Sequence, residues 1–433
     1  MENYQDIFED NQEFLNNRTG RNLQGNIIQS HGRKHVAFLT LHWDDDDTQA
    51  SRSLKKYLSI LADPPANNPD RISISTAARE NKTRKTYGKA STSPELFIGI
   101  YLTYQGFEFF EKENEYKEIY DHLKDRDLRA DMQDKGGWET RMKNIPQMML
   151  MMAHSSENFV KQRAAYFLNI FKQRFEALES SFVEYGKVYH NRFGKPVEHF
   201  GFADGYSQPW FLPKPGRILP SAGQWNPVRD VREFLVEESV TGRKCFGSFL
   251  AYRKFEQHVE AFAAEQIVQA EQLGVSPALA GAKMVGRFTE GSPLALYDAA
   301  TTTKKSLDGR ELNFFNYNND TEGNKCPFSA HIRKMNNRTD SDGPMIIRRG
   351  VTYGERRLKT NGEFDSQNFP SKDVGLHFLS FQKSLATFKN LLPKPNGDTA
   401  HDAILGDLKS GLVQMKGGSN YYAPSIEFFR KLK

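Results

Sequence analysis

The segment CPFSAHIRKMNNRTDSDGPMIIRRGVTYG, residues 326–354, combines one histidine with two adjacent arginines. The histidine is His331, and Arg348 and Arg349 follow it within an apolar run, Met345–Tyr353. The letters HIRKMNNR predict a short basic helix, whereas the apolar run has the pattern of a strand. Because side chains alternate along a strand, one arginine can face a pocket while the other faces away. Taken alone, the pair also fits an edge strand with both charges in solvent.

A second motif lies upstream, in the turn Gly201-Phe202-Ala203-Asp204-Gly205. Its two glycines allow the backbone to turn sharply and to approach another group closely. The ordinary interpretation of such a turn is an aspartate that hydrogen-bonds to its own backbone. A histidine, an arginine and an aspartate are nevertheless the side chains needed to hold a haem iron and to cleave a peroxide there.

Two side chains of the first segment, Cys326 and His331, could bind a haem iron. A thiolate ligand usually lies in a glycine-rich loop, and the sequence KCPFSA around Cys326 is not one. The sequence also has no CxxCH motif, which excludes covalent c-type attachment. We therefore favour His331 as the iron ligand, with Arg333 and Arg338 close enough in sequence to meet haem propionates. The alternative for these arginines is a solvated helix face.

The composition is typical of a soluble globular protein of 433 residues, 38% hydrophobic and 26% charged. The 59 basic and 54 acidic residues leave a net charge of only +5, so there is no electrostatic case for nucleic-acid binding. No run approaches the ~18 apolar residues of a membrane span, and no secretory signal is visible. The cysteines, Cys245 and Cys326, are expected to be free thiols in a reducing, cytoplasmic compartment.

Runs rich in aromatic and β-branched residues predict strands at His35–Trp43, Leu96–Tyr104, Gly247–Arg253 and Gly375–Gln382. One helix is expected after the strand Gly247–Arg253, ending at Ala270, and another over Lys383–Leu392. Residues 107–191 have a mostly helical pattern. Each half of the chain thus repeats strand, helices, strand and helix, which indicates two α+β units rather than a βαβ series. We expect a polar N-terminal tail, an N-terminal unit and a C-terminal unit at residues 1–20, 21–200 and 201–433.

Two clusters within these units invite a metal-binding interpretation. The segment Met148–His154, MMLMMAH, could suggest copper, but we interpret it as a buried helix filled with adaptable side chains. The run Asp44–Asp47 could bind a divalent cation, but a solvated loop that supplies a helix N-cap is the simpler interpretation. Neither cluster is therefore predicted to hold a metal ion.

Together, these segments resemble the dye-decolorising peroxidase family. The turn GFADG matches the GxxDG signature of the family, NKCPFSAHIRKMNNR matches its proximal-histidine block, and MIIRRGVTYG matches its distal-arginine block. The segment GLHFLSFQKSL is similar to the distal-side strand and the helix that follows it. Residues 23–43 resemble the opening strand of the longer, signal-free members, and residues 417–425 resemble the usual terminus. The matches span roughly 400 residues in the expected order.

The resemblance implies an α+β fold of two ferredoxin-like units, with antiparallel sheets, surrounding helices and the haem held mainly by the C-terminal half. It implies His331 as the proximal iron ligand, and Asp204 and Arg348 on the distal face. Leu376 and Phe378 would form the apolar lining of the distal side.

One position departs from the family pattern, which commonly has Asn-Pro-Arg after the proximal histidine. This chain has Asn336-Asn337-Arg338 instead, and the lost proline loosens the turn that would carry Asn336 and Arg338 to the haem. Asp402, in HDAILGD, is a candidate for the acidic residue that orients His331.

The function implied by the resemblance is that of a peroxidase with one non-covalent haem b per chain. It would use hydrogen peroxide to oxidise dyes, phenols or other aromatic donors, with neither a nucleic-acid nor a membrane partner, and it could form homo-oligomers. Asp204 would move a proton between the peroxide oxygens while Arg348 stabilises the developing charge. Because a carboxylate works as a base at lower pH than a histidine, we expect an acidic optimum. The alternative is a haem carrier or iron-release protein, which would not need both Asp204 and Arg348.

Overall fold

The computed structural model describes the chain except for residues 1–3, 45–47, 66–71, 88–92, 127–136, 214–225, 239–243, 302–312, 314, 337–342, 344, 392–401, 407–410 and 433. Asp45–Asp47, Asn337 and Arg338 therefore lie outside the described residues.

The first half of the chain contains α1 (Tyr4–Asn16), α2 (Arg18–Asn22), β1 (His35–Leu41), α3 (Thr48–Ala62), α4 (Ala77–Tyr87), β2 (Phe97–Leu102), α5 (Tyr104–Phe109), α6 (Lys117–Lys124), η2 (Thr140–Met142), β3 (Met148–His154), α8 (Glu157–Phe175), β4 (Phe182–Lys187), β5 (Tyr189–His190) and β6 (Pro196–Val197). The second half contains η3 (Val231–Phe234), β7 (Val236–Glu238), β8 (Cys245–Gln257), α9 (Val259–Leu273), α10 (Pro277–Val285), α11 (His331–Met335), β9 (Ile347–Arg348), β10 (Val351–Tyr353), β11 (Gly375–Gln382), α12 (Leu385–Leu391), β12 (Val413–Ala423) and α13 (Ile426–Arg430). The four predicted strands correspond to β1, β2, β8 and β11, and the predicted helices after the last two correspond to α9 and α12.

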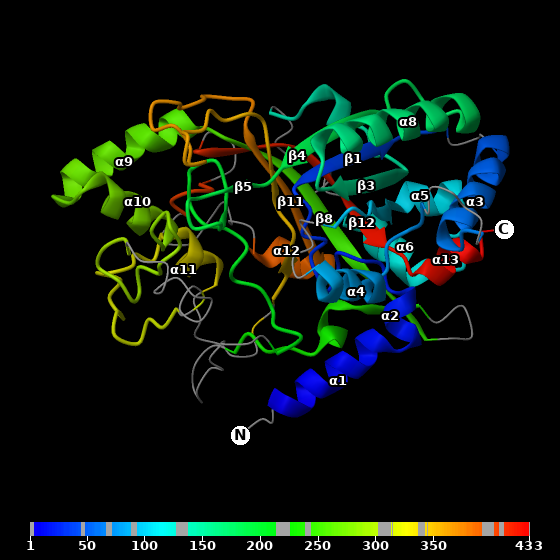
Figure 1. Ribbon diagram of the computed structural model, residues 1–433, viewed down its shortest axis with the longest axis horizontal. Helices are drawn as coiled ribbons and strands as arrows, with labels where there is room; N and C mark the ends of the chain where they lie inside the picture. The colour runs from blue at the N-terminus through cyan, green and yellow to red at the C-terminus, as the bar shows by residue number, and fades with distance from the viewer. Residues whose placement is uncertain are drawn as a thin grey trace.

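One ten-stranded sheet runs through the molecule in the order β10-β11-β8-β12-β2-β3-β1-β4, with β7 beside β8 and β9 beside β11. Neighbouring strands are antiparallel, and the groups from the two halves join where Tyr422 of β12 lies opposite Leu102 of β2. Helices cover the sheet and lie at both ends of the molecule, with α3 and α8 at one end and α9 and α10 at the other (Figure 1). The predicted α+β class is confirmed, whereas the division at residues 200/201 stays a prediction.

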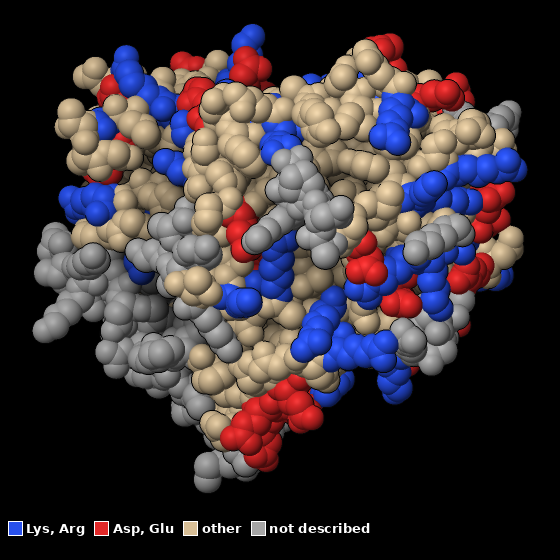
Figure 2. Space-filling model, turned by 45° about the vertical axis from the view of Figure 1, so that its right-hand side comes forward, with Lys and Arg blue, Asp and Glu red and all other residues tan. Residues whose placement is uncertain are grey.

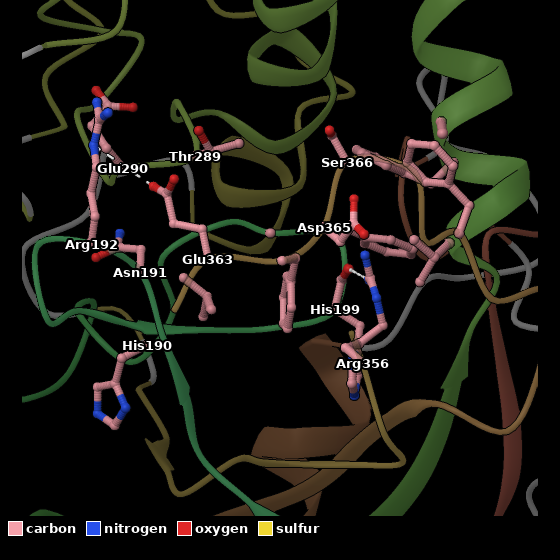
Figure 3. A pocket seen from close by; sticks show the side chains of 18 of the residues that line it. His190, Asn191, Arg192, His199, Thr289, Glu290, Arg356, Glu363, Asp365 and Ser366 are labelled. Atoms are coloured by element: carbon pink, nitrogen blue, oxygen red, sulfur yellow. Dashed lines mark hydrogen bonds and ion pairs between the residues drawn. The ribbon is translucent and has the colours of Figure 1, made fainter. Parts of the chain in front are cut away.

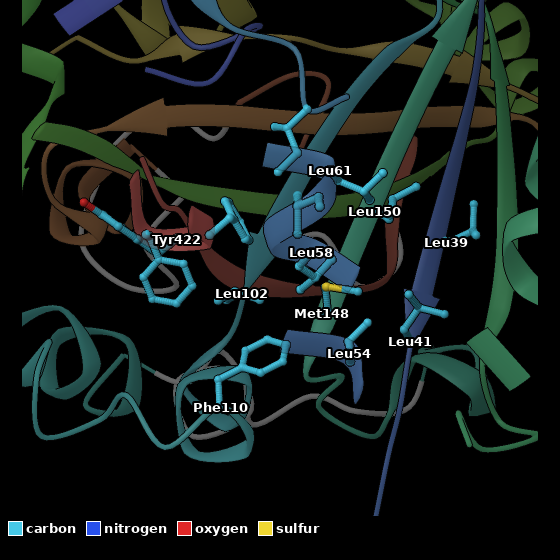
Figure 4. Close-up of a cluster of buried hydrophobic side chains, with 14 of the residues drawn as sticks. Leu39, Leu41, Leu54, Leu58, Leu61, Leu102, Phe110, Met148, Leu150 and Tyr422 are labelled. Carbon is cyan, nitrogen blue, oxygen red and sulfur yellow. The ribbon is translucent and has the colours of Figure 1, made fainter. Parts of the chain in front are cut away.

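The segment Met148–His154 is strand β3, so the prediction of a helix here was wrong. It lies between β1 and β2 and is buried on both faces of the sheet. Alternate side chains enter two different core clusters, with Met148, Leu150 and Met152 on one face and Met149, Met151 and Ala153 on the other. Figure 4 shows the first cluster, where side chains of α3 pack over β1, β2 and β3. A strand apolar on both faces lacks the alternation that distinguishes it from a buried helix.

Residues 1–20 contain the docked helices α1 and α2 rather than the expected polar tail. Asn11 of α1 is fully buried, and its Nδ2 donates to the carbonyl oxygens of Phe211 and Arg229 at 3.0 and 2.8 Å. Its Oδ1 accepts from the backbone N–H of Val231 at 3.0 Å. Asn11 anchors this helix together with the buried side chains of Phe8, Phe14 and Leu15, which recur at helical spacing.

None of the described helices is both long and apolar enough to cross a membrane. Acidic and basic side chains are interspersed over the face of the molecule in Figure 2, in keeping with the small net charge.

A buried ion pair between Arg33 and Glu80 ties the segment before β1 to α4. The Arg33 guanidinium also donates to the carbonyl oxygens of Glu95 and His31, at 3.1 and 2.9 Å. Replacing Arg33 by Met leaves Glu80 buried without its cation, and we expect the free energy of unfolding to fall by about 3–5 kcal/mol. Denaturant unfolding measures this change. Lys117→Met, in the exposed pair with Asp121, is the control and should cost less than about 1 kcal/mol; equal losses would contradict the prediction.

Candidate active site

The side chain of His331 opens the short helix α11 and is held by Asp402. The His331 Nδ1 lies 2.9 Å from Asp402 Oδ2, and the Asp402 side chain is fully buried. The other carboxylate oxygen accepts the backbone N–H groups of Ile404 and Leu405 at 2.9 and 2.8 Å. Since Nδ1–H donates to this carboxylate, the lone pair of Nε2 is left for a metal ion. Asp402, a candidate partner by sequence, therefore holds His331 in the tautomer of an iron ligand.

Electrostatics in this pair follow from burial and from the partner's charge. Burial lowers the pKa of His331, but the adjacent Asp402 carboxylate outweighs it and the net pKa is raised. Burial raises the pKa of Asp402, and the His331 interaction together with two backbone donors reverses this, so that its pKa lies below the usual value. Asp402 thus stays ionised and able to accept the imidazole proton.

Arg333 fixes the loop before this histidine instead of entering the cavity. Its guanidinium donates to the carboxylate and carbonyl oxygens of Asp320, each at 2.8 Å, and also to the carbonyl oxygen of Cys326. The Asp320 carboxylate accepts in turn from the backbone N–H of Cys326 at 2.9 Å. Arg333 is therefore engaged away from the propionate role expected for it, and it contributes to the position of His331 through the chain.

The GxxDG turn brings Asp204 to the same cavity as His331. Gly201 and Gly205 have φ values of +94° and +83°, which side chains other than glycine rarely allow. The backbone N–H of Ala203 donates to Thr289 at 3.1 Å, and that of Asp204 donates to Pro196 at 3.0 Å. The turn is thus bonded to two other segments, and the Asp204 carboxylate is free to point inward rather than cap its own backbone.

Arg348 lies beside Asp204, with Nη1 3.2 Å from Asp204 Oδ1. Gln208 fixes the backbone of Arg348 by accepting its N–H at 2.9 Å and donating to its carbonyl oxygen at 3.1 Å. Arg349 points the other way and donates to the carbonyl oxygens of Asn26, Ile27 and Ile28. The alternation expected for the two arginines is what the structure shows, with Arg348 at the cavity.

Six residues proposed from the sequence line this single cavity: Asp204, His331, Asn336, Arg348, Leu376 and Phe378. Leu376 and Phe378 project from β11, and further apolar side chains come from α10, α11, α12 and the segment after Asp402. Most of the cavity wall is thus apolar, and Asp204, His331 and Arg348 are among the polar side chains that line it.

Two further charged residues, Arg287 and Glu198, line the cavity and were missed by the sequence analysis. Arg287 is buried, and burial followed by the charge of Arg348 lowers its pKa to about 10. Burial also raises the pKa of Glu198 to about 7, against hydrogen bonds from the backbone of Phe200 and Phe202. Nothing in their sequence surroundings distinguishes these two from the other arginines and glutamates, because the fold alone brings them to the cavity.

These residues fit a haem. A macrocycle needs an apolar slot, an axial ligand and cations for its propionates. Here the slot is lined by aliphatic and aromatic side chains, His331 presents Nε2, and Arg287 and Arg348 supply positive charge. Asp204 and Arg348 lie together at this cavity, where they can act on a small molecule bound there.

Comparison with known proteins shows which proteins this chain is similar to. The family model described as Dyp-type peroxidase, C-terminal, matches residues 226–428. Multifunctional dye peroxidase DyP2 from an Amycolatopsis species is 31% identical over 296 residues, which are 56% of this chain and 62% of that protein. This chain is similar to dye-decolorising peroxidases, through the family model over residues 226–428 and through its fold. A curated dye-decolorizing peroxidase of Exidia glandulosa is 32% identical over 204 residues, 43% of this chain and 40% of its own.

Solved dye-decolorising peroxidases share the whole fold. The crystal structure of an Anabaena DyP-type peroxidase superposes with a TM-score of 0.77 at 26% identity and covers 100% of this chain and 95% of its own. The DyP2 structure from Amycolatopsis superposes with a TM-score of 0.74 at 24% identity, which supports the fold alone. The matches to the curated relatives span less than two thirds of the length of those proteins, so the activity of this dye-decolorising peroxidase homologue is argued below from its own residues.

Proposed function

We propose that this protein is a haem-dependent peroxidase that uses hydrogen peroxide to oxidise aromatic donors such as phenols and dyes. Each chain would bind one non-covalent haem b through His331, with Arg287, Arg348, Asn336, Leu376 and Phe378 around it. When bound, the haem iron would supply the redox chemistry that splits the peroxide O–O bond.

The carrying observation is that two polar pairs meet at one cavity. Asp402 orients His331, and Asp204 and Arg348 lie 3.2 Å apart. A haem carrier or iron-release protein needs the histidine and the slot, but it does not need a carboxylate beside a guanidinium on the open side. The pair therefore favours peroxidase chemistry over the carrier alternative.

The roles of the two distal residues follow from their chemistry. The Asp204 carboxylate would accept a proton from the inner oxygen of hydrogen peroxide and return it to the outer oxygen, which leaves as water. The Arg348 guanidinium, always charged, would stabilise the negative charge that develops on the departing oxygen. Overall, one hydrogen peroxide and two donor hydroxyl groups would give two water molecules and two donor radicals, so atoms and electrons balance.

A direct test is to load the purified protein with haem and to follow oxidation of 2,6-dimethoxyphenol with and without hydrogen peroxide. We expect peroxide-dependent oxidation whose rate is highest at acidic pH. Stable haem binding without oxidation at any pH between 3 and 8 would instead support the carrier alternative. Molar mass by light scattering checks the predicted homo-oligomer, and the cytoplasmic location stays a prediction.

Asp402→Asn is expected to weaken haem retention by about 10–100-fold, because a metal-bound histidine loses its oriented acceptor. Asn keeps the size of the side chain but allows the imidazole to rotate or change tautomer. Competition for haem with apomyoglobin measures the change, and Asp320→Asn, which perturbs the same loop through Arg333, is the control. Loss of the same size in both variants would indicate a general effect of loop stability rather than orientation of His331.

A further inference from the structure

A second cavity, of about 410 Å³, lies next to the proposed haem cavity. Its walls come from the β5–β6 hairpin, one face of α9, residues 289–301 and the loop 356–369. Phe200 lines both cavities, and Gly201 of the GxxDG turn also borders the second one. The two cavities are thus separated by the turn that carries Asp204.

Flat aromatic surfaces form the middle of this second cavity. Phe200 stacks on Phe262 of α9 with ring centroids 4.3 Å apart and an interplanar angle of 20°. Phe364 stacks on His199 at 5.9 Å and 16°. Parallel rings of this kind at a cavity wall favour a planar aromatic ligand.

One end of the cavity holds a buried cation, Arg356, which is 7% exposed. Its Nη1 donates to the carbonyl oxygen of His199 at 2.6 Å and its Nε to Asn368 at 3.3 Å, but no ion pair within the described part of the chain includes it. The nearby Asp365 is paired with Arg357 at 2.6 Å. A buried guanidinium bonded only to neutral oxygens is a receptor for an anion.

Glu198 is a weak counter-charge for Arg356. It interacts with Arg356 only through space, and burial raises the pKa of Glu198 to about 7. Near neutral pH its carboxyl is therefore partly protonated, and it does not cancel the charge of Arg356.

The other end of the cavity holds a buried carboxylate, Glu290, with Asn191 and Arg192 nearby (Figure 3). Glu290 Oε1 accepts from the backbone N–H of Thr301 at 2.8 Å and from the hydroxyl of Ser292, whereas Oε2 is buried and has no partner among the described residues. Asn191 Nδ2 is also buried and has no partner in the described part of the chain, and Arg192 is paired with Glu363 at 3.7 Å. This end therefore calls for a ligand group that donates to Glu290 and accepts from Asn191, as a hydroxyl does.

We propose that the second cavity binds aromatic carboxylates that carry a hydroxyl group at the far end of the ring. The carboxylate would lie on Arg356, the ring against the phenylalanines, and the hydroxyl on Glu290. This inference rests on the proposed peroxidase function for its role: such ligands are phenolic reductants, bound one wall away from the haem cavity, and each can give up one electron and one proton.

Binding of 4-hydroxybenzoate to the haem-loaded protein without peroxide tests the proposal by isothermal titration calorimetry. We expect 4-hydroxybenzoate to bind saturably. The affinity for phenol, which lacks the carboxylate, and for benzoate, which lacks the hydroxyl, should each be at least tenfold lower. Arg356→Gln should weaken 4-hydroxybenzoate at least tenfold, whereas Lys359→Gln, which removes an exposed charge from the same loop, should leave affinity unchanged. Glu290→Gln should lower the affinity for 4-hydroxybenzoate but not the affinity for benzoate. This variant therefore tests the cavity even if Arg356→Gln does not fold.

The outcomes separate this proposal from the peroxidase proposal. The second site would be overturned if the wild type and both cavity variants bound 4-hydroxybenzoate with equal affinity. It would also be overturned if the wild type bound phenol as tightly as 4-hydroxybenzoate. Neither result would affect the peroxidase proposal. Binding that follows the expected pattern in a protein without peroxide turnover would support the site and overturn the peroxidase function. With both intact, Arg356→Gln should raise the KM for 4-hydroxybenzoate at least tenfold.

Discussion

Asp204→Asn is expected to lower the rate of the reaction with hydrogen peroxide by about 10²–10⁴-fold, the contribution of a positioned general base. The amide keeps the size of the side chain and can still contact Arg348, whose Nη1 lies 3.2 Å from Asp204 Oδ1. It cannot accept the peroxide proton, however. Because the His331–Asp402 pair is unchanged, haem should still be retained at wild-type levels.

Stopped-flow absorbance of the haem-loaded variant after mixing with peroxide measures this rate directly. Asp121→Asn, which removes an exposed carboxylate on α6, is the control and should react like the wild type. A rate within threefold of the wild type in Asp204→Asn would contradict the proton-transfer role. Loss of haem in that variant would mean that Asp204 supports the cavity rather than the chemistry.

Local rules of backbone geometry were sufficient for part of the site. The two glycines around Asp204 predicted a tight turn, and both adopt positive φ. Strand alternation predicted that only one arginine of the pair Arg348 and Arg349 faces the cavity. These features depend on neighbouring residues only, so the sequence contains the information that determines them.

The rest of the site depends on contacts between distant segments. Arg287 and Glu198 reach the cavity because the fold brings together the segment after α10 and the segment after β6. Arg333 looked like a propionate partner because it follows His331, but Asp320, across a loop, binds it instead. Strand β3 was mistaken for a helix for a related reason, since its burial on both faces comes from two partner strands that its own sequence does not reveal.

His331→Ala is expected to weaken haem binding by ~100-fold or more, a larger loss than that from an outer-shell partner alone. The apolar walls and the arginines would remain, so weak, non-ligated binding can persist while the visible spectrum changes. Haem titration followed by absorbance measures both properties. His190→Ala, which removes an exposed histidine on β5, is the control and should bind haem like the wild type.

A stricter version of this experiment uses His331→Gly with imidazole added to the buffer. Asp402 is held by the backbone N–H groups of Ile404 and Leu405, so it stays in place when the side chain of His331 is removed. It can then accept a hydrogen bond from free imidazole and direct the second nitrogen into the cavity. We expect imidazole to restore the haem spectrum in His331→Gly but not in His331→Gly combined with Asp402→Ala. Restoration of the same size in both would show that Asp402 does not orient the ligand, and an unchanged spectrum in His331→Gly alone would overturn the ligand assignment.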